Sequence, residues 1–505
     1  MDNSLTHVRA CGLSSLAEGL SDSACRVEGD ALLTGVTYDS RSVTSGDLFV
    51  ALRGADFDGH DFVPDAVARG AAAVMVEREM ALSVPQLVVR DTRSSLPIVA
   101  AAFFDHPSQH LDVIGITGTD GKTTTSYLVD AILRRSGTKT GMIGTVAIRI
   151  GDLVDHHASR QTTPESLDIQ RYLRAMVDAG VVWAVVEATS HGLDLHRLDE
   201  TRFVIGAVTN ITHEHLEHHG TVEAYRRAKG VLFERVAAAR GTAVINADDP
   251  GAMEMITFAS GGTLLRYSAS ARPADIVAEE IELRATGSSF DVSDGTTRRR
   301  VNLPLLGGFN VENALCAAGV AAAAGLSWDA IVDGLEGVEP IPGRLARIDA
   351  GQPFSVVVDY AHTPESLAKV LRLLRSLHPS GRLIVVSGSA GERDVQKRPL
   401  QGAVCARLAD YSVFTSEDPR FEDPESIIRQ IAEGAEDAGG RPGLTFETVT
   451  DRRDAIRQAI TVARPGDCVL LAGKGHESSM IWGREKRPWN EGEVARDVLA
   501  DWRPR

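Results

Sequence analysis

The sequence predicts an α/β fold built on parallel sheets, and three observations support this prediction. From about residue 107 onward, short apolar runs alternate with stretches of helical period, as expected for parallel strands connected by helices. The alternation restarts after the Pro-Gly pair Pro342-Gly343, which indicates a domain boundary. With 505 residues, of which 43% are hydrophobic, the chain can form about three domains of roughly 100–200 residues.

The predicted elements follow in order along three domains. Residues 1–106 form a small N-terminal α/β domain, with strand-like runs DLFVAL and AAAVMV. Residues 107–341 form a central domain with a parallel sheet of the P-loop ATPase type, whose strands are predicted from LDVIGITG, VVWAVVEATS and FVIGAVTN. Residues 342–505 form a C-terminal Rossmann-like domain, with strands predicted from FSVVVDYAHT, RLIVVSGSAG, YSVFTSEDPR and DCVLLAGKGHE.

The composition is typical of a protein of the cytoplasm. The net charge is −16, with 53 Lys and Arg against 69 Asp and Glu, so no general positive field attracts nucleic acid. The five cysteines lie far apart and lack C-x-x-C spacing, which indicates reduced thiols. The N-terminus lacks a signal-peptide pattern, and no window approaches about 18 consecutive apolar residues. We expect a cytoplasmic monomer with no membrane span and no nucleic-acid partner.

The stretch VIGITGTDGKTTT is a candidate phosphate loop. Residues 113–116 suit a buried strand and the segment after Thr123 has helical spacing, so the glycines lie at a strand-to-helix turn. Backbone N–H groups and the helix dipole attract phosphate there, Lys122 can neutralise its charge, and the Thr123 hydroxyl can bind Mg2+. Ile116 stands where the strict P-loop pattern has its first glycine, so the loop is a variant. A glycine turn without a ligand is the alternative, but it does not explain Lys-Thr-Thr at the helix start.

Two further candidate residues follow apolar runs. Glu187 ends VVWAVVE, which places its carboxylate at the C-terminal end of a strand, where α/β sheets present ligands. His215 lies just beyond FVIGAV, in the His-rich segment THEHLEHHG. That segment also contains His213, His218 and His219, and a zinc site is an alternative because Mg2+ prefers oxygen ligands. For three of the four histidines, a solvated or hydrogen-bonding role is favoured over metal binding.

The variant loop TGTDGKTTT resembles the ATP loop of the Mur ligases, the ATP-dependent amide-forming enzymes that build the peptidoglycan peptide. Other segments resemble motifs of this family, in the same order and over almost the whole chain. They are YDSRSVTSGDLFVAL, QTTPES, EATSHGLDLHR, TNITHEHLEHHG, RRAKGVLF, GGFNVENALCAA, PGRLARID, DYAHTPESL, GERDVQKRP, EDPRFEDP and GKGHE. The combination of DYAHTP, the element EDPR, which is similar to D-x-P-R, and GKGHE is more specific than the loop alone. It is most similar to the family members that add the third residue of the peptide.

This resemblance implies an ATP-dependent ligase of cell wall synthesis, which activates a carboxylate as an acyl phosphate and joins it to an amine. The implied ligands are ATP, Mg2+, UDP-N-acetylmuramoyl-L-alanyl-D-glutamate and a diamino acid. The implied catalytic residues are Lys122, Glu187, His215 and Lys229, and the implied metal ligands are Thr123, Glu187 and His215. The implied nucleotide contacts are Gly118, Thr119, Asp120, Gly121, Lys122, Thr123, Thr124, Asn310, Asn313, Arg344 and Asp359. The implied contacts to the UDP substrate are Ser40, Arg41, Thr162, Thr163, Thr189 and Arg197, and those to the amino acid are Arg393, Glu417, Asp418, Pro419, Arg420, Gly473 and Glu477.

Lys229 lies on the helical stretch EAYRRAKGVLFERV, where a surface lysine is the simple alternative. In the resembled family, the lysine at this place is carbamylated to N6-carboxylysine, an anion that supports Mg2+. Carbamylation requires a neutral amine, and the nearby cations Arg226 and Arg227 favour that form.

We favour meso-diaminopimelate as the added residue, with L-lysine and L-ornithine as the alternatives. Family members that add meso-diaminopimelate typically show D-N-P-R, whose arginine can pair with the distal carboxylate. Here the motif is EDPR: Arg420 gives a reason to favour diaminopimelate, whereas Glu417 and Asp418 add negative charge that suits L-lysine or L-ornithine. Asp120 and Leu195 also depart from the usual asparagine and glutamine. A folylpolyglutamate-synthase-like ligase and a P-loop ATPase module without ligase activity are alternative functions.

Overall fold

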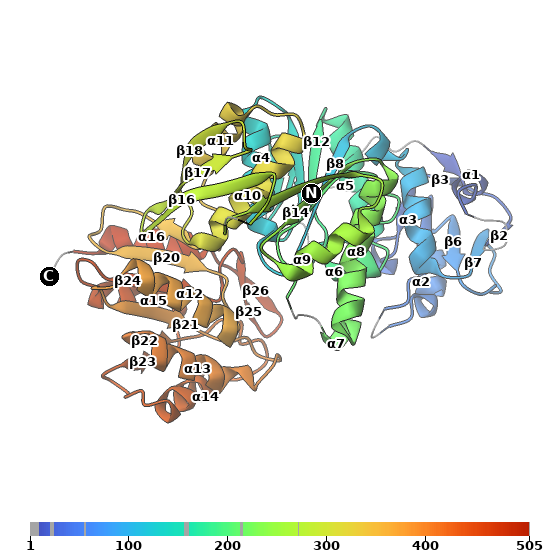
Figure 1. Cartoon of the computed structure of the whole chain (residues 1–505). Coiled ribbons are helices and arrows are strands. Elements are labelled where there is room, and N and C mark those ends of the chain that lie inside the picture. Colours follow the sequence, from blue (N-terminus) through green and yellow to red (C-terminus); the bar gives the residue numbers. More distant parts are fainter. Residues whose placement is uncertain are drawn as a thin grey trace. The chain divides into compact units, whose positions relative to one another are not determined.

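The computed structural model describes residues 10–20, 25–54, 57–155, 161–212, 216–270 and 272–503. Its strands form three large sheets, of five, eleven and six strands, and two small two-stranded sheets (Figure 1). The chain divides into two compact units. The first unit comprises Met1–Glu279, Asp291–Val301 and Val311–Gly337, and the second comprises Glu280–Phe290, Asn302–Asn310 and Val338–Arg505. The α/β class with three main sheets is confirmed, and the domain boundaries after residues 106 and 341 stay predictions.

The N-terminal part contains the five-stranded sheet. Its elements are β1 (Cys11–Gly12), α1 (Leu13–Ala17), β2 (Cys25–Glu28), β3 (Leu32–Leu33), β4 (Gly35–Thr37), η2 (Ser40–Ser42), β5 (Asp47–Val50), η3 (Gly59–Phe62), α2 (Val63–Ala68), β6 (Ala73–Val76), β7 (Gln86–Val89) and α3 (Thr92–Phe103). The strand order is β2-β7-β6-β5-β4, and only β2 and β7 pair antiparallel. Successive side chains alternate between the two faces: Leu48 packs in the cluster that contains α1 and α3, and Phe49 in the cluster that contains α2. The predicted strands DLFVAL and AAAVMV therefore lie side by side in this sheet.

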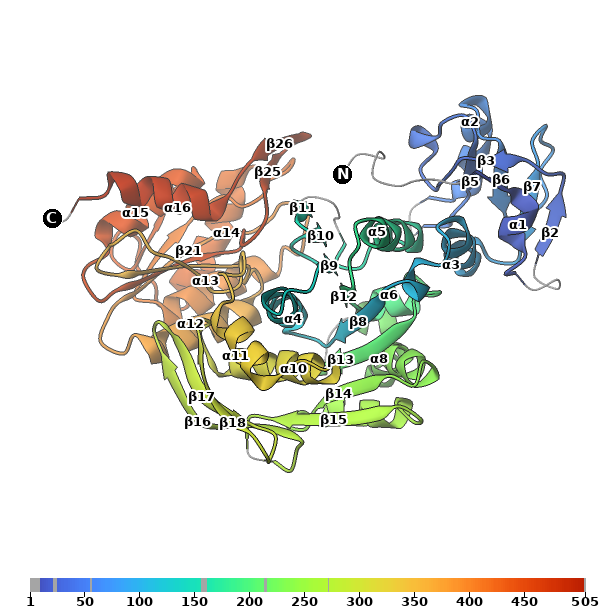
Figure 2. The same cartoon turned by 90° about the horizontal axis from the view of Figure 1, so that it is seen from above.

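The central sheet has eleven strands. Its elements are η4 (Pro107–Gln109), β8 (Asp112–Thr117), α4 (Lys122–Arg135), β9 (Thr140–Ile143), β10 (Ile148–Ile150), β11 (Leu153–Asp155), α5 (Ser166–Asp178), β12 (Trp183–Glu187), α6 (Ser190–Asp194), β13 (Phe203–Val208), α7 (Leu216–His219), α8 (Val222–Ala238), β14 (Thr242–Asn246), α9 (Pro250–Met253), η5 (Glu254–Phe258), β15 (Thr263–Ser268), β16 (Ile276–Arg284), β17 (Gly287–Ser293), β18 (Arg298–Leu303), α10 (Gly308–Ala323) and α11 (Trp328–Glu336). The strand order is β11-β10-β9-β12-β8-β13-β14-β15-β16-β17-β18, and neighbours from β9 to β16 are parallel. In Figure 2, α4, α10 and α11 lie on one side of the parallel strands, and α5, α6 and α8 lie on the other. Because both faces are covered, the strands are apolar throughout, which explains the runs that predicted them.

The six-stranded sheet belongs to the second unit. Its elements are β19 (Ala346–Ile348), β20 (Ser355–Asp359), α12 (Pro364–Leu377), β21 (Leu383–Ser387), α13 (Lys397–Leu408), β22 (Tyr411–Phe414), α14 (Pro424–Asp437), β23 (Phe446–Thr448), α15 (Arg452–Val462), β24 (Cys468–Ala472), β25 (Ser479–Trp482), β26 (Glu485–Pro488) and α16 (Glu491–Asp501). The strand order is β19-β20-β24-β21-β22-β23, and all pairs except β19 with β20 are parallel. Leu383 and Val385 pack in the cluster that contains α12, α13 and α14, whereas Ile384 and Val386 pack in the cluster that contains α15 and α16. All four strands predicted from this part of the sequence are confirmed.

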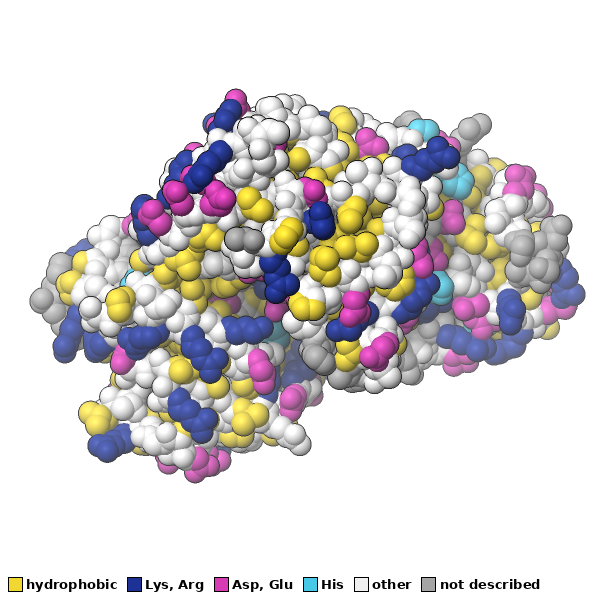
Figure 3. Space-filling view, viewed as in Figure 1, with side chains coloured by type: hydrophobic (Ala, Val, Ile, Leu, Met, Phe, Trp, Pro, Cys, Tyr) yellow, Lys and Arg dark blue, Asp and Glu magenta, His cyan; other side chains and the backbone are white. Residues whose placement is uncertain are grey.

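The surface carries charges of both signs. On the face shown in Figure 3, Lys and Arg side chains are interspersed with Asp and Glu side chains. Within the described ranges, we find no helix with the length and apolar character that crossing a bilayer requires.

Candidate active site

The glycine-rich stretch forms a tight turn between β8 and α4. Gly118 and Gly121 have φ values of +146° and +87°, which is a backbone conformation that favours glycine. A Cβ atom at Gly118 would lie 1.9 Å from the Thr209 hydroxyl oxygen, and one at Gly121 would lie 2.3 Å from Asn313 Oδ1. Ile116, which replaces the first glycine of the strict motif, is a buried residue of β8. The turn therefore begins only after the strand, at Gly118.

Two lysine side chains meet at this turn. Lys122, the first residue of α4, donates hydrogen bonds from Nζ to the carbonyl oxygens of Gly118 at 2.9 Å and Thr119 at 2.8 Å. Lys229 of α8 donates from Nζ to the same Gly118 oxygen at 2.8 Å. Lys229 is only 1% exposed, and its Nζ lies 4.6 Å from the centroid of the Tyr225 ring. The simple alternative of a surface lysine is therefore wrong.

The two arginines that precede Lys229 on α8 have partners of their own. Arg226 pairs with Glu254 at 2.8 Å, and Arg227 pairs with Glu234 at 3.1 Å. Carboxylates therefore balance both charges, and the effect of these arginines on Lys229 stays a prediction.

Glu187 ends β12 with a fully buried carboxylate that faces α4. Its Oε2 accepts hydrogen bonds from the hydroxyl groups of Thr123 at 3.0 Å and Thr145 at 2.9 Å, and its Oε1 accepts one from the Thr145 backbone N–H at 3.1 Å. A Cβ atom at Gly144 would lie 2.3 Å from this Oε1, so the close approach requires glycine. Two of the predicted metal ligands, Thr123 and Glu187, are therefore neighbours at the ends of adjacent elements.

The third predicted metal ligand, His215, lies outside the described residues, and so does His213. The role of His215 stays a prediction. The next described element, α7, begins at residue 216.

Residues predicted to hold the UDP substrate gather beside Glu187. The Thr163 hydroxyl donates to the backbone oxygen of Glu187 at 2.7 Å and shares a 2.9 Å hydrogen bond with the Thr189 hydroxyl. Thr189 also caps α6, because its Oγ1 accepts the Gly192 N–H at 3.0 Å. Arg197 donates to the Thr163 backbone oxygen at 3.1 Å. The motifs QTTPES and EATSHGLDLHR are thus joined by side-chain hydrogen bonds.

Of the other three predicted UDP contacts, Thr162 shares a 2.9 Å hydrogen bond with the Thr145 hydroxyl. Ser40 and Arg41 form a short turn in the N-terminal part. The Arg41 side chain is largely exposed and donates to Asp39 at 2.8 and 2.9 Å. These hydrogen bonds lower the pKa of Asp39. Arg41 is therefore positioned by its own turn.

The two predicted adenine contacts are both buried but have different surroundings. Asn313 lies against the phosphate loop, where its Oδ1 accepts a 3.4 Å hydrogen bond from the Thr125 hydroxyl. Asn310, in the first turn of α10, donates from Nδ2 to the backbone oxygen of Leu306, which precedes the helix, at 2.9 Å.

In the second unit, the motif DYAHTP begins with Asp359 and Tyr360, at the end of β20. Asp359 accepts backbone N–H groups from Leu345 and Ala361, both at 2.8 Å, and burial raises its pKa. The Arg344 guanidinium lies 5.8 Å from the centroid of the Tyr360 ring. Arg344 and Asp359 are therefore brought together, and Arg344 opposes the effect of burial on the pKa of Asp359.

Two of the predicted amino-acid contacts, Asp418 and Glu477, pair with a buried cation, Lys474, which lies between β24 and β25. Its fully buried Nζ donates to Asp418 Oδ1 at 2.9 Å and also to Glu477. Asp418 Oδ1 accepts a second hydrogen bond from the Ile481 N–H at 2.9 Å. Burial raises the pKa of Glu477, and Lys474 opposes that shift. The charge that Asp418 adds to the motif is therefore balanced inside the protein.

The remaining residues of this group lie at the same edge of the sheet. Glu417 is 6% exposed, and its Oε2 has no hydrogen-bond partner among the described residues. A Cβ atom at Gly473, where φ is +104°, would lie 2.6 Å from this oxygen. Arg420 has a φ of +54°, and its backbone is fixed by hydrogen bonds with Ile481 and Gly483. Pro419 is buried and Arg393 is exposed.

Comparison with known proteins identifies the family. Family descriptions match three successive segments: "Mur ligase family, catalytic domain" over residues 32–110, "Mur ligase middle domain" over residues 116–321, and "Mur ligase, glutamate ligase domain" over residues 343–475. The UDP-N-acetylmuramyl-tripeptide synthetase of Roseiflexus sp. (strain RS-1) is 46% identical over 93% of this chain and 95% of its own length. The chain belongs to the Mur ligase family.

Two further matches support the Mur ligase assignment. The UDP-N-acetylmuramoyl-L-alanyl-D-glutamate–2,6-diaminopimelate ligase of Geobacillus kaustophilus (strain HTA426) is 41% identical over 94% of this chain and 96% of its own. A solved structure of a ligase with the same description has a TM-score of 0.67 and 32% identity, and it covers 93% of this chain and 95% of its own. The expected three-domain fold and the resemblance to Mur ligases are thus confirmed.

Sequence reasoning missed three residues that contact predicted site residues in one or the other unit of this Mur ligase. Thr145 follows β9, so its position at a strand end beside β12 was a usable signal. Glu165, in the motif QTTPES, pairs with Arg197 at 2.9 Å and with Arg93 of α3 at 3.3 Å. Lys474 is part of GKGHE, but its burial becomes visible only in the fold.

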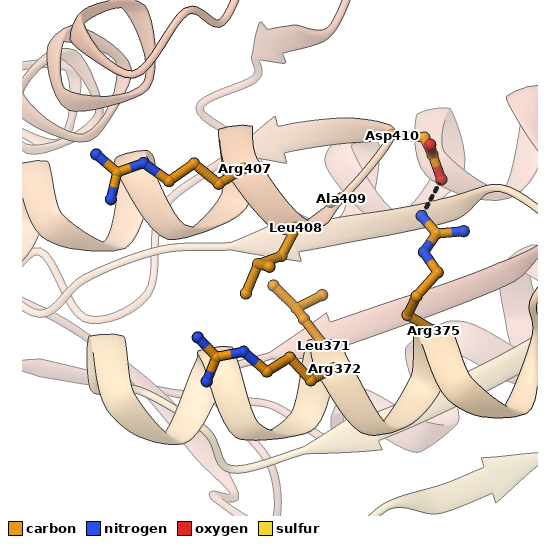
Figure 4. A pocket seen from close by; sticks show the side chains of 7 residues that line it. All are labelled: Leu371, Arg372, Arg375, Arg407, Leu408, Ala409 and Asp410. Carbon is orange, nitrogen blue, oxygen red and sulfur yellow. Dashed lines mark hydrogen bonds and ion pairs between the residues drawn. The ribbon is translucent and has the colours of Figure 1, made fainter.

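A surface pocket of about 390 Å³ lies between α12 and α13 in the second unit of this Mur ligase. Figure 4 shows its three arginines, of which Arg375 pairs with Asp410. None of the predicted site residues lines this pocket.

Proposed function

We propose that this Mur ligase adds a diamino acid, meso-diaminopimelate, to UDP-N-acetylmuramoyl-L-alanyl-D-glutamate with the hydrolysis of ATP. The observation that carries the proposal is the convergence of Lys122, Lys229, Thr123 and Glu187 on one turn at the ends of β8 and β12. Such a site suits two anions that must react with each other, because fixed cations and N–H groups stabilise the charge that develops. The names of the full-length relatives supply the substrate class.

The proposed reaction has two steps. An oxygen of the substrate carboxylate attacks the γ-phosphorus of ATP, and the bond from that phosphorus to the ADP oxygen breaks. The amine nitrogen of the diamino acid then attacks the acyl carbon, phosphate leaves, and the nitrogen loses a proton to give the amide. Lys122 would neutralise phosphate charge, and the backbone N–H groups at the start of α4 would hold phosphate oxygens.

The residues present fit Mg2+ as the metal. The Thr123 hydroxyl and the Glu187 carboxylate are hard oxygen donors 3.0 Å apart, of the kind that Mg2+ prefers. By resemblance, we assign His215 as a further ligand. When bound, Mg2+ would screen the charge between the carboxylate and the phosphates.

By resemblance, we also propose that Lys229 carries a carbamate. The lysine ammonium would first lose one proton to become a neutral amine. Its nitrogen would then bond to the carbon of CO2 and lose a second proton, so that a cation becomes an anion. The burial of Lys229 beside Gly118 supports a role within the site rather than on the surface.

The second unit supports diaminopimelate as the added residue. A buried Glu417 oxygen without a partner in the described parts of the chain suits an ammonium group. Asp418 is held by Lys474, so it no longer favours a simple cationic tail. Arg420 then supplies a partner for a distal carboxylate.

The test is to incubate the protein with ATP, Mg2+ and the muramoyl dipeptide, with and without each diamino acid. We expect phosphate release that depends on the amino acid, with the highest kcat/KM for meso-diaminopimelate over L-lysine and L-ornithine. Lys122→Ala should abolish this phosphate release, whereas Lys139→Ala, at an exposed lysine, should leave it unchanged. Arg420→Ala should remove the preference for diaminopimelate.

Each alternative function gives a different result. Phosphate release that ignores the amino acid indicates an ATPase module. Activity with a folate and glutamate in place of the muramoyl dipeptide indicates a folylpolyglutamate-synthase-like ligase. Better use of L-lysine or L-ornithine, unchanged in Arg420→Ala, would contradict the preference for diaminopimelate.

A further inference from the structure

Three histidines and one aspartate form a cluster between α6 and α7 of the first unit, beside the residues assigned above. Thr189 caps α6, and the His219 ring lies 5.4 Å from the Tyr225 ring. His218 Nε2 lies 2.8 Å from Asp194 Oδ2. The ring centroids of His218 and His219 are 4.7 Å apart, and His191 lies 4.3 Å from His218. One ligand atom each from Asp194, His218 and His219 lie within 4.8 Å of one another.

The chemistry of this donor set differs from that of the magnesium position. Two imidazoles and one carboxylate suit a borderline divalent ion such as Zn2+, Co2+ or Ni2+, whereas Mg2+ prefers oxygen ligands alone. Three protein ligands with a fourth position left for water is also a common arrangement for zinc.

To bind one ion, the three ligand atoms need to move only slightly closer together. With metal–ligand distances of about 2.1 Å, tetrahedral ligand atoms lie about 3.4 Å apart. Asp194 and His218 have side-chain exposures of 47% and 30%, so their side chains have room to rotate. Metal binding would replace the proton that Asp194 and His218 now share in their hydrogen bond.

We propose that Asp194, His218 and His219 form a binding site for a divalent transition-metal ion, which joins the end of α6 to α7. The bound ion would link two segments on either side of residues 195–215. His191, whose ring stacks on His218, would support the orientation of that imidazole. This site is separate from the proposed ligase function and does not require it.

The test is titration of tag-free protein with Co2+, whose visible absorption reports the ligand geometry, and with Zn2+ by calorimetry. We expect binding of one ion, with an affinity reduced about 10–100-fold in His218→Ala, His219→Ala and Asp194→Asn. Zn2+ should also raise the Tm of the wild-type protein and not of these variants, because only a folded site binds the ion. The matched control is His110→Ala, at another exposed histidine near an aspartate, Asp105, at 3.9 Å, and it should bind as the wild type does.

Two results would overturn the proposal. One is equal affinity in the wild type and in all three cluster variants. The other is binding that survives these three substitutions but is lost in Glu187→Gln, because the ion would then occupy the magnesium position. Melting in EDTA shows whether each variant is folded before metal is added.

Discussion

The ion pair between Lys474 and Asp418 gives a direct test of how the second unit is built. The perturbation is Lys474→Met, which keeps the length of the side chain and removes its charge. In the structure, the Lys474 side chain is fully buried and that of Asp418 is 10% exposed, with 2.9 Å between Nζ and Oδ1. Among the described residues, the substitution therefore leaves the buried Asp418 carboxylate with the Ile481 N–H as its remaining hydrogen-bond partner.

Removal of one partner from a buried ion pair costs about 3–5 kcal/mol. We expect the lower end, about 3 kcal/mol, because Asp418 keeps one hydrogen bond and the side chain of Glu477 is 34% exposed to water. For a domain of the size of the second unit, about 150–250 residues, 1 kcal/mol shifts Tm by about 2–4 °C. Lys474→Met should therefore lower the Tm of this unit by about 6–12 °C.

The assay is thermal unfolding of the wild type, Lys474→Met, Asp418→Asn and the double variant. The double variant should recover part of the loss, because the neutral amide no longer needs a cation. Lys486→Met, at an exposed lysine of β26, is the matched control and should leave Tm unchanged. Equal Tm values for Lys474→Met and Lys486→Met, or a double variant that is no more stable than Lys474→Met, would refute the reasoning.

Three further predictions follow from the first unit. Lys229→Ala should lose most ligase activity, and a short carboxylic acid at high concentration should restore part of that activity by supplying the missing anion. If mass spectrometry of an active sample shows Lys229 unmodified, this would count against the carbamate. Gly121→Ala and Gly137→Ala both place a side chain at positive φ, +87° and +84°, which costs about 1–2 kcal/mol of stability each. Only the Cβ atom at position 121 also lies 2.3 Å from Asn313 Oδ1, so Gly121→Ala alone should lose ATP binding. Equal ATP affinity in the two variants would contradict the clash. A hydrogen bond to Asp199 raises the pKa of His196, so the contribution of this pair to stability is complete below about pH 6.5 and is lost as the pH rises through the higher pKa of the folded state. The Tm difference between wild type and His196→Ala should therefore be larger at about pH 5.5 than at about pH 8.5. A Tm difference independent of pH would be inconsistent with this assignment.

The sequence predicted the elements of the sheets because buried parallel strands are continuous apolar runs. The run before Gly118 became β8, and the run in FSVVVDYAHT became β20. Glu187 was placed correctly at a strand end for the same reason, and its contact with Thr123 follows from the neighbouring positions of β12 and β8.

Contacts between distant segments could not be predicted in this way. Whether Lys229 faces solvent or Gly118 depends on how α8 packs against the sheet, and helical spacing alone leaves that open. The charge of Asp418 is balanced by Lys474, which is 56 residues away. The cluster of Asp194 with His218 likewise joins residues 24 positions apart. In each case, the fold decides which charges are paired.

Ligation through an acyl phosphate is the central claim, and the transfer of oxygen from the carboxylate to phosphate tests it most directly. The muramoyl dipeptide is labelled with 18O in its reactive carboxylate and incubated with ATP, Mg2+, meso-diaminopimelate and the protein. We predict that the phosphate released with each tripeptide molecule carries one labelled oxygen. That oxygen bridges the acyl carbon and the phosphorus before the amine attacks. Release of unlabelled phosphate, with the dipeptide recovered unchanged, would contradict the proposed reaction.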